Sequence, residues 1–246
     1  VVAGVFLVAR LFPLYIEAAP QLLPYIAYVG AFTSLFAAII ACVQSDIKRV
    51  LAFSTISQIG FMMVALGVSG YGGHDGLGYV ASMWHLFTHA MFKALLFLGA
   101  GAVIHAVHSN EMEHMGGLRK FMPFTHITFL VACLAIAGIP PFSGFYSKDE
   151  ILSATYMFSP VLFGLMAAIA GLTAFYMFRL YFRIFWSTPT DTSHATPHEA
   201  PKVMYLPLVL LAVVTLFAGF IPFGEFVTSD GADYHVHINW AIGGPS

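Results

Sequence analysis

Residues 123–156 read PFTHITFLVACLAIAGIPPFSGFYSKDEILSATY, and this stretch decides the fold of the chain. At about 1.5 Å per residue, a straight helix of this length would be far too long for a single bilayer crossing. Its centre, Gly138–Phe145, holds two prolines and two glycines, which remove backbone donors and loosen the chain. Broken membrane helices are tolerated where they are buried in protein or line a water-filled cavity. We therefore predict one discontinuous helix, broken at residues 138–147.

The composition places the rest of the chain in a membrane as well. Of 246 residues, 59% are hydrophobic and 9% are charged, whereas a soluble domain carries roughly a quarter charged residues. The other apolar runs are Val1–Ile16, Leu23–Val43, Val50–Val68, Tyr79–Val107, Val161–Trp186 and Val203–Pro222. We expect a fragment, in which residues 1–16 end a preceding transmembrane helix and residues 223–246 form an outer loop and the start of a truncated span. The predicted fold class is an all-α polytopic membrane protein.

The positions of Lys and Arg predict the side that each loop faces, because positive residues stay on the cytoplasmic or equivalent side. If residues 123–156 count as one crossing, one side receives Lys48, Arg49, Arg119, Lys120, Arg183 and Lys202. The other side receives the acidic residues Glu17, Asp75, Glu225, Asp230 and Asp233, and no Lys or Arg. Every loop then agrees with one alternating topology, which supports a single broken crossing at 123–156.

Lys93 lies near the middle of its apolar span, and His85 and His89 precede it at four-residue intervals. These three residues share one helical face and rise by about 6 Å per step. Intramembrane ionisable residues mark paths for ions or protons by default, and histidine can pass protons between its two ring nitrogens. We therefore predict a proton relay. The alternatives are a structural lysine that caps a carbonyl or pairs with an acid, hydrogen-bonded interior histidines, and a histidine pair that binds a metal or haem.

Lys148 with Asp149 is the second candidate site, because both lie next to the predicted helix break. We expect the second half of the broken helix to begin at Ser147, whose side chain suits an N-cap. Asp149 would then be a counter-charge that tunes the proton affinity of Lys148. The alternative is that this Ser-Lys-Asp-Glu cluster lies at the outer interface and anchors the helix.

Other patterns point away from redox or metal chemistry in this chain. Cys42 and Cys133 lie in apolar spans without CxxC or Cys/His spacing, and neither a third ligand nor an HExxH glutamate accompanies the histidine pair. No phosphate-binding glycine loop and no flavin, haem or iron–sulfur signature is visible, and nothing indicates nucleic-acid binding. The polar cluster Ser54, Thr55, Ser57 and Gln58 is expected to hold water or to hydrogen-bond across helices.

Four blocks resemble the antiporter-like subunits of respiratory complex I, NADH:quinone oxidoreductase, and among them the largest, L-type chain. They are DIKRVLAFSTISQIGF at 46–61, HLFTHAMFKALLFL at 85–98, MGGLRK at 115–120 and GFYSKDEIL at 144–152. The resemblance implies two inverted five-helix repeats, of which residues 23–186 are the second, followed by an additional transmembrane helix at 203–222.

The resemblance also implies roles for individual residues. Lys93 would be the central proton carrier, His85 and His89 the linking histidines, and Lys148 with Asp149 the station that leads to the outer face. Protons would move along this Lys/His axis, coupled to quinone reduction in other subunits. The FMN, iron–sulfur clusters and quinone are expected in those partner subunits, with no cofactor in this chain.

The implied partners are the lipid bilayer and other complex I membrane subunits, especially a neighbouring antiporter-like subunit. The predicted location is a bacterial inner membrane, with mitochondrial inner and thylakoid membranes as alternatives. The alternative function is the large subunit of a multisubunit Mrp-type cation/proton antiporter, whose fold is shared. The sequence leaves open whether Na⁺ can replace H⁺.

Overall fold

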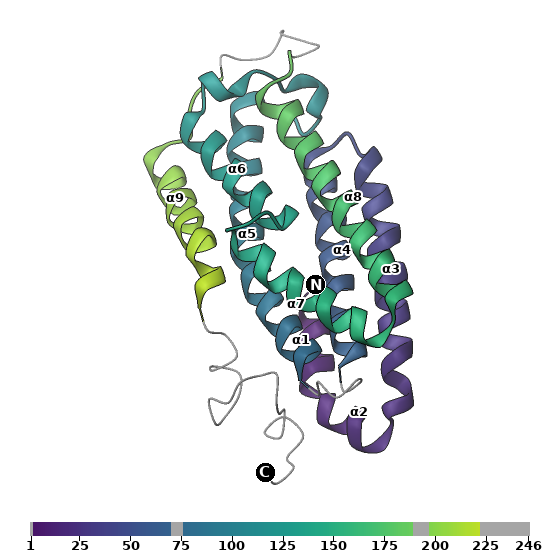
Figure 1. The fold of residues 1–246 in the computed structure, drawn as a ribbon. Coiled ribbons are helices and arrows are strands. Elements are labelled where there is room, and N and C mark those ends of the chain that lie inside the picture. Colours follow the sequence, from purple (N-terminus) through teal and green to yellow (C-terminus); the bar gives the residue numbers. More distant parts are fainter. Residues whose placement is uncertain (1, 70–75, 189–196, 222–246) are drawn as a thin grey trace.

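The computed structural model describes residues 2–69, 76–188 and 197–221, and all regular elements in these residues are helices (Figure 1). The α-helices are α1 Ala3–Arg10, α2 Phe12–Ala18, α3 Leu23–Val43, α4 Ile47–Val68, α5 Leu77–Val107, α6 Pro123–Ala137, α7 Ser143–Phe158, α8 Pro160–Phe185 and α9 Lys202–Phe217. Short 3₁₀ helices follow at Pro20–Leu22, Met112–His114, Leu118–Lys120 and Ala218–Phe220. Within the described residues, five helical stretches are long and apolar enough to cross a membrane: 20–43, 47–68, 77–107, 160–185 and 202–220. The prediction of an all-α polytopic membrane protein is confirmed.

The discontinuous helix is present, as α6 and α7. Helix α6 ends at Gly138, which has a positive φ of 77° and donates its N–H to the carbonyl of Ala135. Glycine is well suited to this left-handed conformation, which closes the helix end. The second half begins at Ser143 rather than at the expected Ser147, because the helix resumes as soon as the two prolines have been passed. Ser147 is therefore not an N-cap.

The start of the chain differs in detail from the expected end of one helix. Two short helices, α1 and α2, meet at Leu11, and Pro13 lies in the first turn of α2. A proline there lacks an N–H that has no partner within the helix anyway, so it favours a new start. The predicted outer loop at 223–246 lies outside the described residues.

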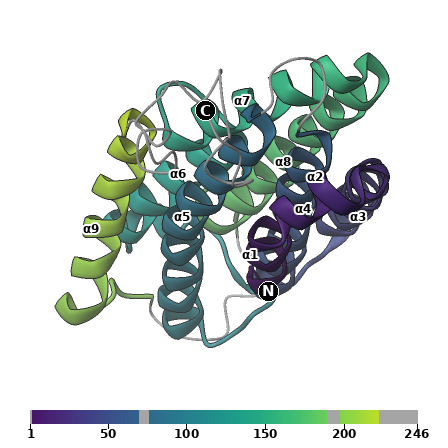
Figure 2. The ribbon, with the colours of Figure 1, turned by 90° about the horizontal axis from the view of Figure 1, so that it is seen from below.

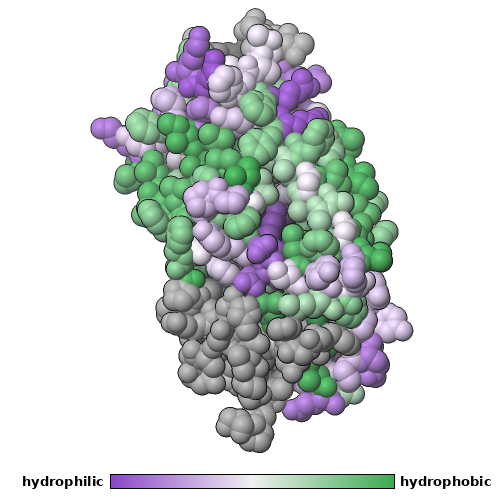
Figure 3. Space-filling model, viewed as in Figure 1, coloured by the Kyte–Doolittle hydropathy of each residue, from purple (hydrophilic) through white to green (hydrophobic). Residues whose placement is uncertain are grey.

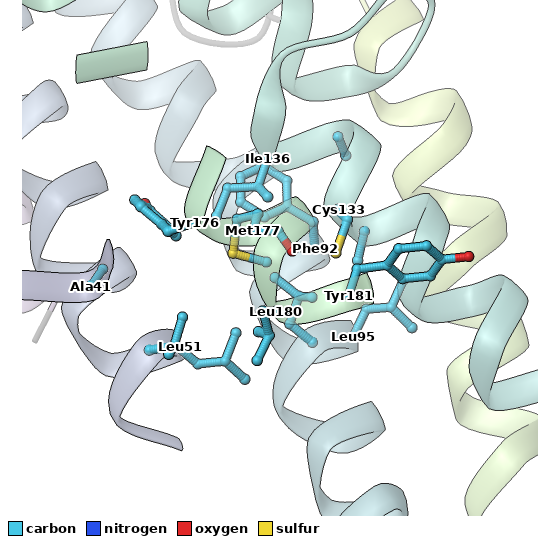
Figure 4. Packing of buried hydrophobic residues seen from close by; sticks show 14 of the residues in the cluster. Ala41, Leu51, Phe92, Leu95, Cys133, Ile136, Tyr176, Met177, Leu180 and Tyr181 are labelled. Carbon is cyan, nitrogen blue, oxygen red and sulfur yellow. Dashed lines mark hydrogen bonds between the residues drawn. The ribbon is translucent and has the colours of Figure 1, made fainter. Parts of the chain in front are cut away.

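Helix α5 is the central element of the bundle. It packs against α4, α6, α7 and α9, and the views in Figures 1 and 2 place α9 and α3 on opposite sides of it. Figure 4 shows part of the core on one flank of α5, where Phe92 lies against Ile136 of α6 and Met177 of α8. Tyr181 points its hydroxyl away from this cluster.

The outer surface of the bundle has the pattern of a protein in lipid. Large apolar side chains are exposed along α3, α8 and α9, among them Phe32, Val161 and Val203. Figure 3 shows a hydrophobic belt around this face of the bundle, with hydrophilic surface at the end where α6 begins. A hydrophilic strip also interrupts the belt at mid-height, over α7 between α5 and α8.

The connections that carry basic residues lie at one end of the bundle. The turn after α3 pairs with the connection after α5, since Ile47 N donates to Asn110 O and Met112 N donates to Ser45 O. The guanidinium of Arg119 lies 3.6 Å from the ring centre of Trp186, at the end of α8. This arrangement agrees with the one-sided charge distribution in the sequence.

Gly67 lets α3 and α4 approach closely, and its replacement by alanine is expected to destabilise the bundle. A Cβ atom there would lie 2.6 Å from the carbonyl oxygen of Leu23 and would also overlap the backbone of Ala27. The gain in helix propensity of about 1 kcal/mol is outweighed by overpacking, so we expect a net loss of about 1–3 kcal/mol. Thermal unfolding of the purified protein measures this loss. Gly171→Ala is the matched control, because nothing lies within 4 Å of its Cβ position; an equal effect in both variants would contradict the prediction.

Candidate functional site

Lys93 reaches from α5 to α4 inside the bundle. Its side chain is 5% exposed, and its Nζ atom donates to the carbonyl oxygen of Leu51 at 3.0 Å and to the Ser54 hydroxyl. Within residues 2–69, 76–188 and 197–221, no carboxylate forms an ion pair with it. Of the two structural interpretations of Lys93, the described residues show the contact with a backbone carbonyl and do not show a permanent pair with an acid. The polar cluster on α4 does hydrogen-bond across helices, as one of its two interpretations predicted.

His85 lies at the junction of four helices. Its Nδ1 atom is 2.8 Å from the Ser147 hydroxyl of α7, and its Nε2 atom is 3.0 Å from Oε1 of Gln58 on α4. The Gln58 amide in turn lies 3.4 Å from Thr173 Oγ1 of α8. These residues are fully buried. A buried imidazole with a polar partner on each nitrogen has the hydrogen bonds that proton exchange requires.

His89 lies between His85 and Lys93 on the same face of α5. Its ring centre is 6.2 Å from that of His85, and its Nε2 atom is buried without a hydrogen-bond partner in the described protein. Buried polar atoms are nearly always satisfied, by ordered water where no protein group reaches them. An internal water is therefore expected beside His89.

Lys148 is held by the break in the discontinuous helix. Its Nζ atom donates to the carbonyl oxygen of Ile136, in the last turn of α6. Such terminal carbonyls lack helical partners and lie at the negative end of the helix dipole, so they suit a cation. The ammonium also lies 5.6 Å from the ring centre of Phe61. Since Lys148 is 3% exposed, it does not anchor the helix at the outer interface.

Asp149 does not supply the counter-charge that the sequence suggested. Its side chain is exposed, whereas Lys148 is buried, and the two form no ion pair. Because the second half of the broken helix starts at Ser143, both residues lie on a regular helix, where neighbours point about 100° apart. Asp149 therefore lies on the outer face of α7, not beside the ammonium.

Several residues of this site were not singled out from the sequence. Ser147 was interpreted as an N-cap, yet its hydroxyl contacts His85 and lies 3.1 Å from Thr88 Oγ1. Thr173 and Tyr176 of α8 join through a 3.4 Å hydrogen bond. The available signal was weak: a buried threonine or serine in an apolar span usually bonds its own helix. Only the packing of α4, α5, α7 and α8 brings these groups together.

The described residues contain no group of three or more His, Cys, Asp or Glu side chains that could hold a metal. Both nitrogens of His85 already have side-chain partners. Cys42 and Cys133 are free thiols, and the Sγ atom of Cys133 lies 3.9 Å from the carbonyl oxygen of Met177. The hydrogen bonds of His85 run across to α7 and α4, and its ring centre lies 6.2 Å from that of His89.

The long apolar helices and the interrupted α6–α7 crossing define an antiporter-like membrane subunit. The family model described as "NADH:quinone oxidoreductase/Mrp antiporter, TM" matches residues 1–174, and the chain belongs to this family. It is an integral membrane protein.

The relatives support the predicted resemblance to the L-type subunit. NAD(P)H-quinone oxidoreductase chain 5 of Picosynechococcus is 45% identical over 92% of this chain and 37% of its own length. NADH-quinone oxidoreductase subunit L of Mycobacterium tuberculosis is 48% identical over 89% of this chain and 34% of its own length. The chain thus spans about a third of the length of these relatives. The predicted resemblance to the L-type subunits of complex I is confirmed.

A solved structure confirms the antiporter-like fold. The Mrp complex of Dietzia has a TM-score of 0.79 at 21% identity, with 88% of this chain and 47% of that chain covered. Other relatives come from chloroplasts and from an archaeon, Methanosarcina mazei. The relatives therefore come from bacteria, chloroplasts and an archaeon.

Proposed function

We propose that this chain forms a proton-translocating part of a quinone oxidoreductase membrane arm, with protons moving between Lys93 and Lys148. The observation that carries the proposal is a set of buried titratable and hydroxyl groups in which the two lysines and His85 have neutral hydrogen-bond partners: Lys93, His89, His85, Ser147 and Lys148. A lysine buried among neutral acceptors pays the cost of desolvation without the compensation of a fixed anion, so it can release its proton during turnover.

The helical geometry supports transfer in short steps. Lys93 and His85 are eight residues apart, which corresponds to about 12 Å along α5. His89 lies midway, and the expected water beside its Nε2 atom shortens each hop. From His85 the path crosses to α7 through the 2.8 Å contact with Ser147. Because neighbouring side chains on a helix point about 100° apart, the proposed path needs a water between Ser147 and Lys148. Lysine donates and accepts through one nitrogen, so each step needs only rotation of a side chain or a water.

Energy for the transfer would come from electron transfer to quinone in other subunits of the complex. In this proposal, charges on neighbouring membrane subunits bias the protonation of Lys93, and the proton then moves towards Lys148 and the outer face. The relatives include an F420H2 dehydrogenase subunit as well as NAD(P)H- and NADH-quinone oxidoreductases. The electron donor is therefore a property of the partner subunits rather than of this site.

A test of the proposal interrupts the line at His89. In the complete protein within its complex, His89→Leu is expected to lower the number of protons moved per electron pair. The loss of one acid–base group slows proton transfer by about 100-fold. Because the Nε2 atom of His89 has no hydrogen-bond partner in the described protein, its removal leaves no protein group without a partner. A pH dye inside sealed vesicles measures pumping, and quinone reduction is followed in parallel. His105→Leu, near the end of α5, is the control.

Unchanged pumping in His89→Leu would overturn the proposal. The same vesicles test the second candidate, a cation/proton antiporter, which the likeness of fold to the Mrp complex favours. The oxidoreductase function predicts pumping that requires an electron donor and persists without Na⁺. Exchange that needs Na⁺ but no electron donor would instead establish the antiporter.

A further inference from the structure

A polar branch leaves the proposed proton path at His85 and ends on α8. The Nε2 atom of His85 is 3.0 Å from Oε1 of Gln58, and Nε2 of Gln58 donates to Thr173 Oγ1 at 3.4 Å. Thr173 Oγ1 donates to the carbonyl oxygen of Ile169 at 3.0 Å and accepts from the Tyr176 hydroxyl at 3.4 Å. The Gln58, His85, Thr173 and Tyr176 side chains are fully buried, so no bulk water competes for these bonds.

The hydrogen that Thr173 gives to Ile169 O sets the order of donors and acceptors along this branch. A threonine hydroxyl has one hydrogen, and Thr173 gives it to Ile169 O, so its oxygen must accept from Gln58. The NH₂ group of Gln58 therefore faces Thr173, and its carbonyl oxygen faces His85. Because a carbonyl oxygen only accepts, the Nε2 atom of His85 must carry a hydrogen.

We propose that Gln58, oriented by Thr173, is a positioning residue that keeps a hydrogen on Nε2 of His85 and leaves Nδ1, which faces Ser147, as the nitrogen that gains and loses protons. The consequence for transport rests on the proposed function, whereas the assignment of the tautomer does not. His85 would thus exchange protons only through Nδ1, with Ser147 on α7, and not through Nε2, which faces Gln58 and α8.

The exchange at Nδ1 balances in atoms and charge. With the hydrogen of neutral His85 on Nε2, the Ser147 hydroxyl donates to Nδ1 across 2.8 Å, in preference to its two other acceptors, Ser143 O at 3.5 Å and Thr88 Oγ1 at 3.1 Å. When a proton reaches the Ser147 oxygen, the original hydroxyl hydrogen passes to Nδ1, and His85 becomes an imidazolium with hydrogens on both nitrogens. Release reverses these moves: Nδ1 returns a hydrogen to the Ser147 oxygen, which gives up its other hydrogen towards Lys148. Thr88, 3.1 Å away, can accept from Ser147 in the charged state.

Thr173→Val in the complete protein within its complex tests the assignment. Valine keeps the shape of threonine but removes the oxygen that accepts from the Gln58 amide. The amide keeps its contact with the Tyr176 hydroxyl, but it is no longer prevented from presenting its NH₂ group to His85. The tautomer is determined from the ring ¹⁵N signals of labelled histidine, with His85 identified by its loss in a His85→Gln variant. Thr155→Val is the matched control, because Thr155 is equally buried and donates only within its own helix, to Ile151 O at 2.7 Å.

In the wild-type protein, His85 should carry its hydrogen on Nε2. In Thr173→Val the tautomer ratio should shift towards Nδ1–H by roughly fivefold, which is the weight of one ordinary hydrogen bond. Pumping should fall with it, Thr173→Ser should restore both, and Thr155→Val should change neither. If Thr173→Val does not assemble, Gln58→Met gives the same comparison.

A wild-type His85 that carries its hydrogen on Nδ1, or an unchanged tautomer in Thr173→Val and Gln58→Met, would overturn the inference. These outcomes are separate from the test at His89. Normal pumping in His89→Leu removes the proposed function but leaves the tautomer to be decided by its spectrum.

Discussion

Replacing Lys93 by methionine is expected to abolish proton transfer through this chain while leaving the bundle folded. The lysine is the only titratable side chain that the described structure places against Leu51 O and Ser54 on α4. Without it, transfer loses an acid–base group worth about 100-fold or more in rate. We expect the ratio of protons pumped to electrons transferred to fall accordingly, measured with a pH dye in vesicles that contain the complete complex.

Stability should change little in this variant, which separates a carrier from a structural lysine. The Leu51 carbonyl keeps the hydrogen bonds from the Ser54 and Thr55 hydroxyls, both at 2.9 Å. Methionine matches the length of the lysine stem, and its thioether avoids the cost of a buried ammonium. We therefore expect a free energy of unfolding within about 1 kcal/mol of the wild type. Thermal unfolding of the purified complex measures it.

Lys93→Arg sharpens the comparison. Arginine keeps the positive charge and the donors to α4, but it does not release its proton under physiological conditions. A carrier role predicts that Lys93→Arg fails to pump, whereas a lysine that only caps a carbonyl would be replaced successfully. Lys202→Met, at the exposed start of α9, is the control. Normal pumping in both Lys93 variants would exclude Lys93 as the carrier.

The sequence was sufficient where periodicity and chain stiffness determine the outcome. Four-residue spacing placed His85, His89 and Lys93 on one face of α5, and all three are buried in the structure. Gly138 and the two prolines that follow it specified the break, because neither residue type continues a helix at low cost. These are local properties of the backbone, so they can be read without knowledge of the packing.

The sequence was insufficient where a contact joins distant segments. Gln58 and Thr173 are separated by 115 positions, and only the packing of α4 beside α8 joins them. The sequence predicted the start of α7 at Ser147, because a serine followed closely by two acids is typical of a helix start. The helix begins one turn earlier, at Ser143. This shift changed the role of Asp149, which lies on the exposed face.

Replacing Lys148 by methionine is expected to stop release of the proton and also to weaken the helix break. Unlike Lys93, Lys148 donates to a carbonyl that has no helical partner, that of Ile136 at the end of α6. Leaving a buried acceptor unsatisfied costs about 1–3 kcal/mol, so the unfolding temperature should fall together with pumping. Lys148→Arg should recover the unfolding temperature more than the pumping, because arginine donates to the carbonyl but holds its proton.

The two lysines can be distinguished by the direction of the block. If protons pass from Lys93 to Lys148, the first turnover of Lys148→Met should take up protons on the basic side of the bundle without releasing them on the other side. Lys93→Met should take up fewer, because the group that receives the proton is gone. Dyes on both sides of the vesicle membrane separate uptake from release. If Lys148→Met released as many protons as it took up, protons would leave by a path that does not use Lys148 or the break between α6 and α7.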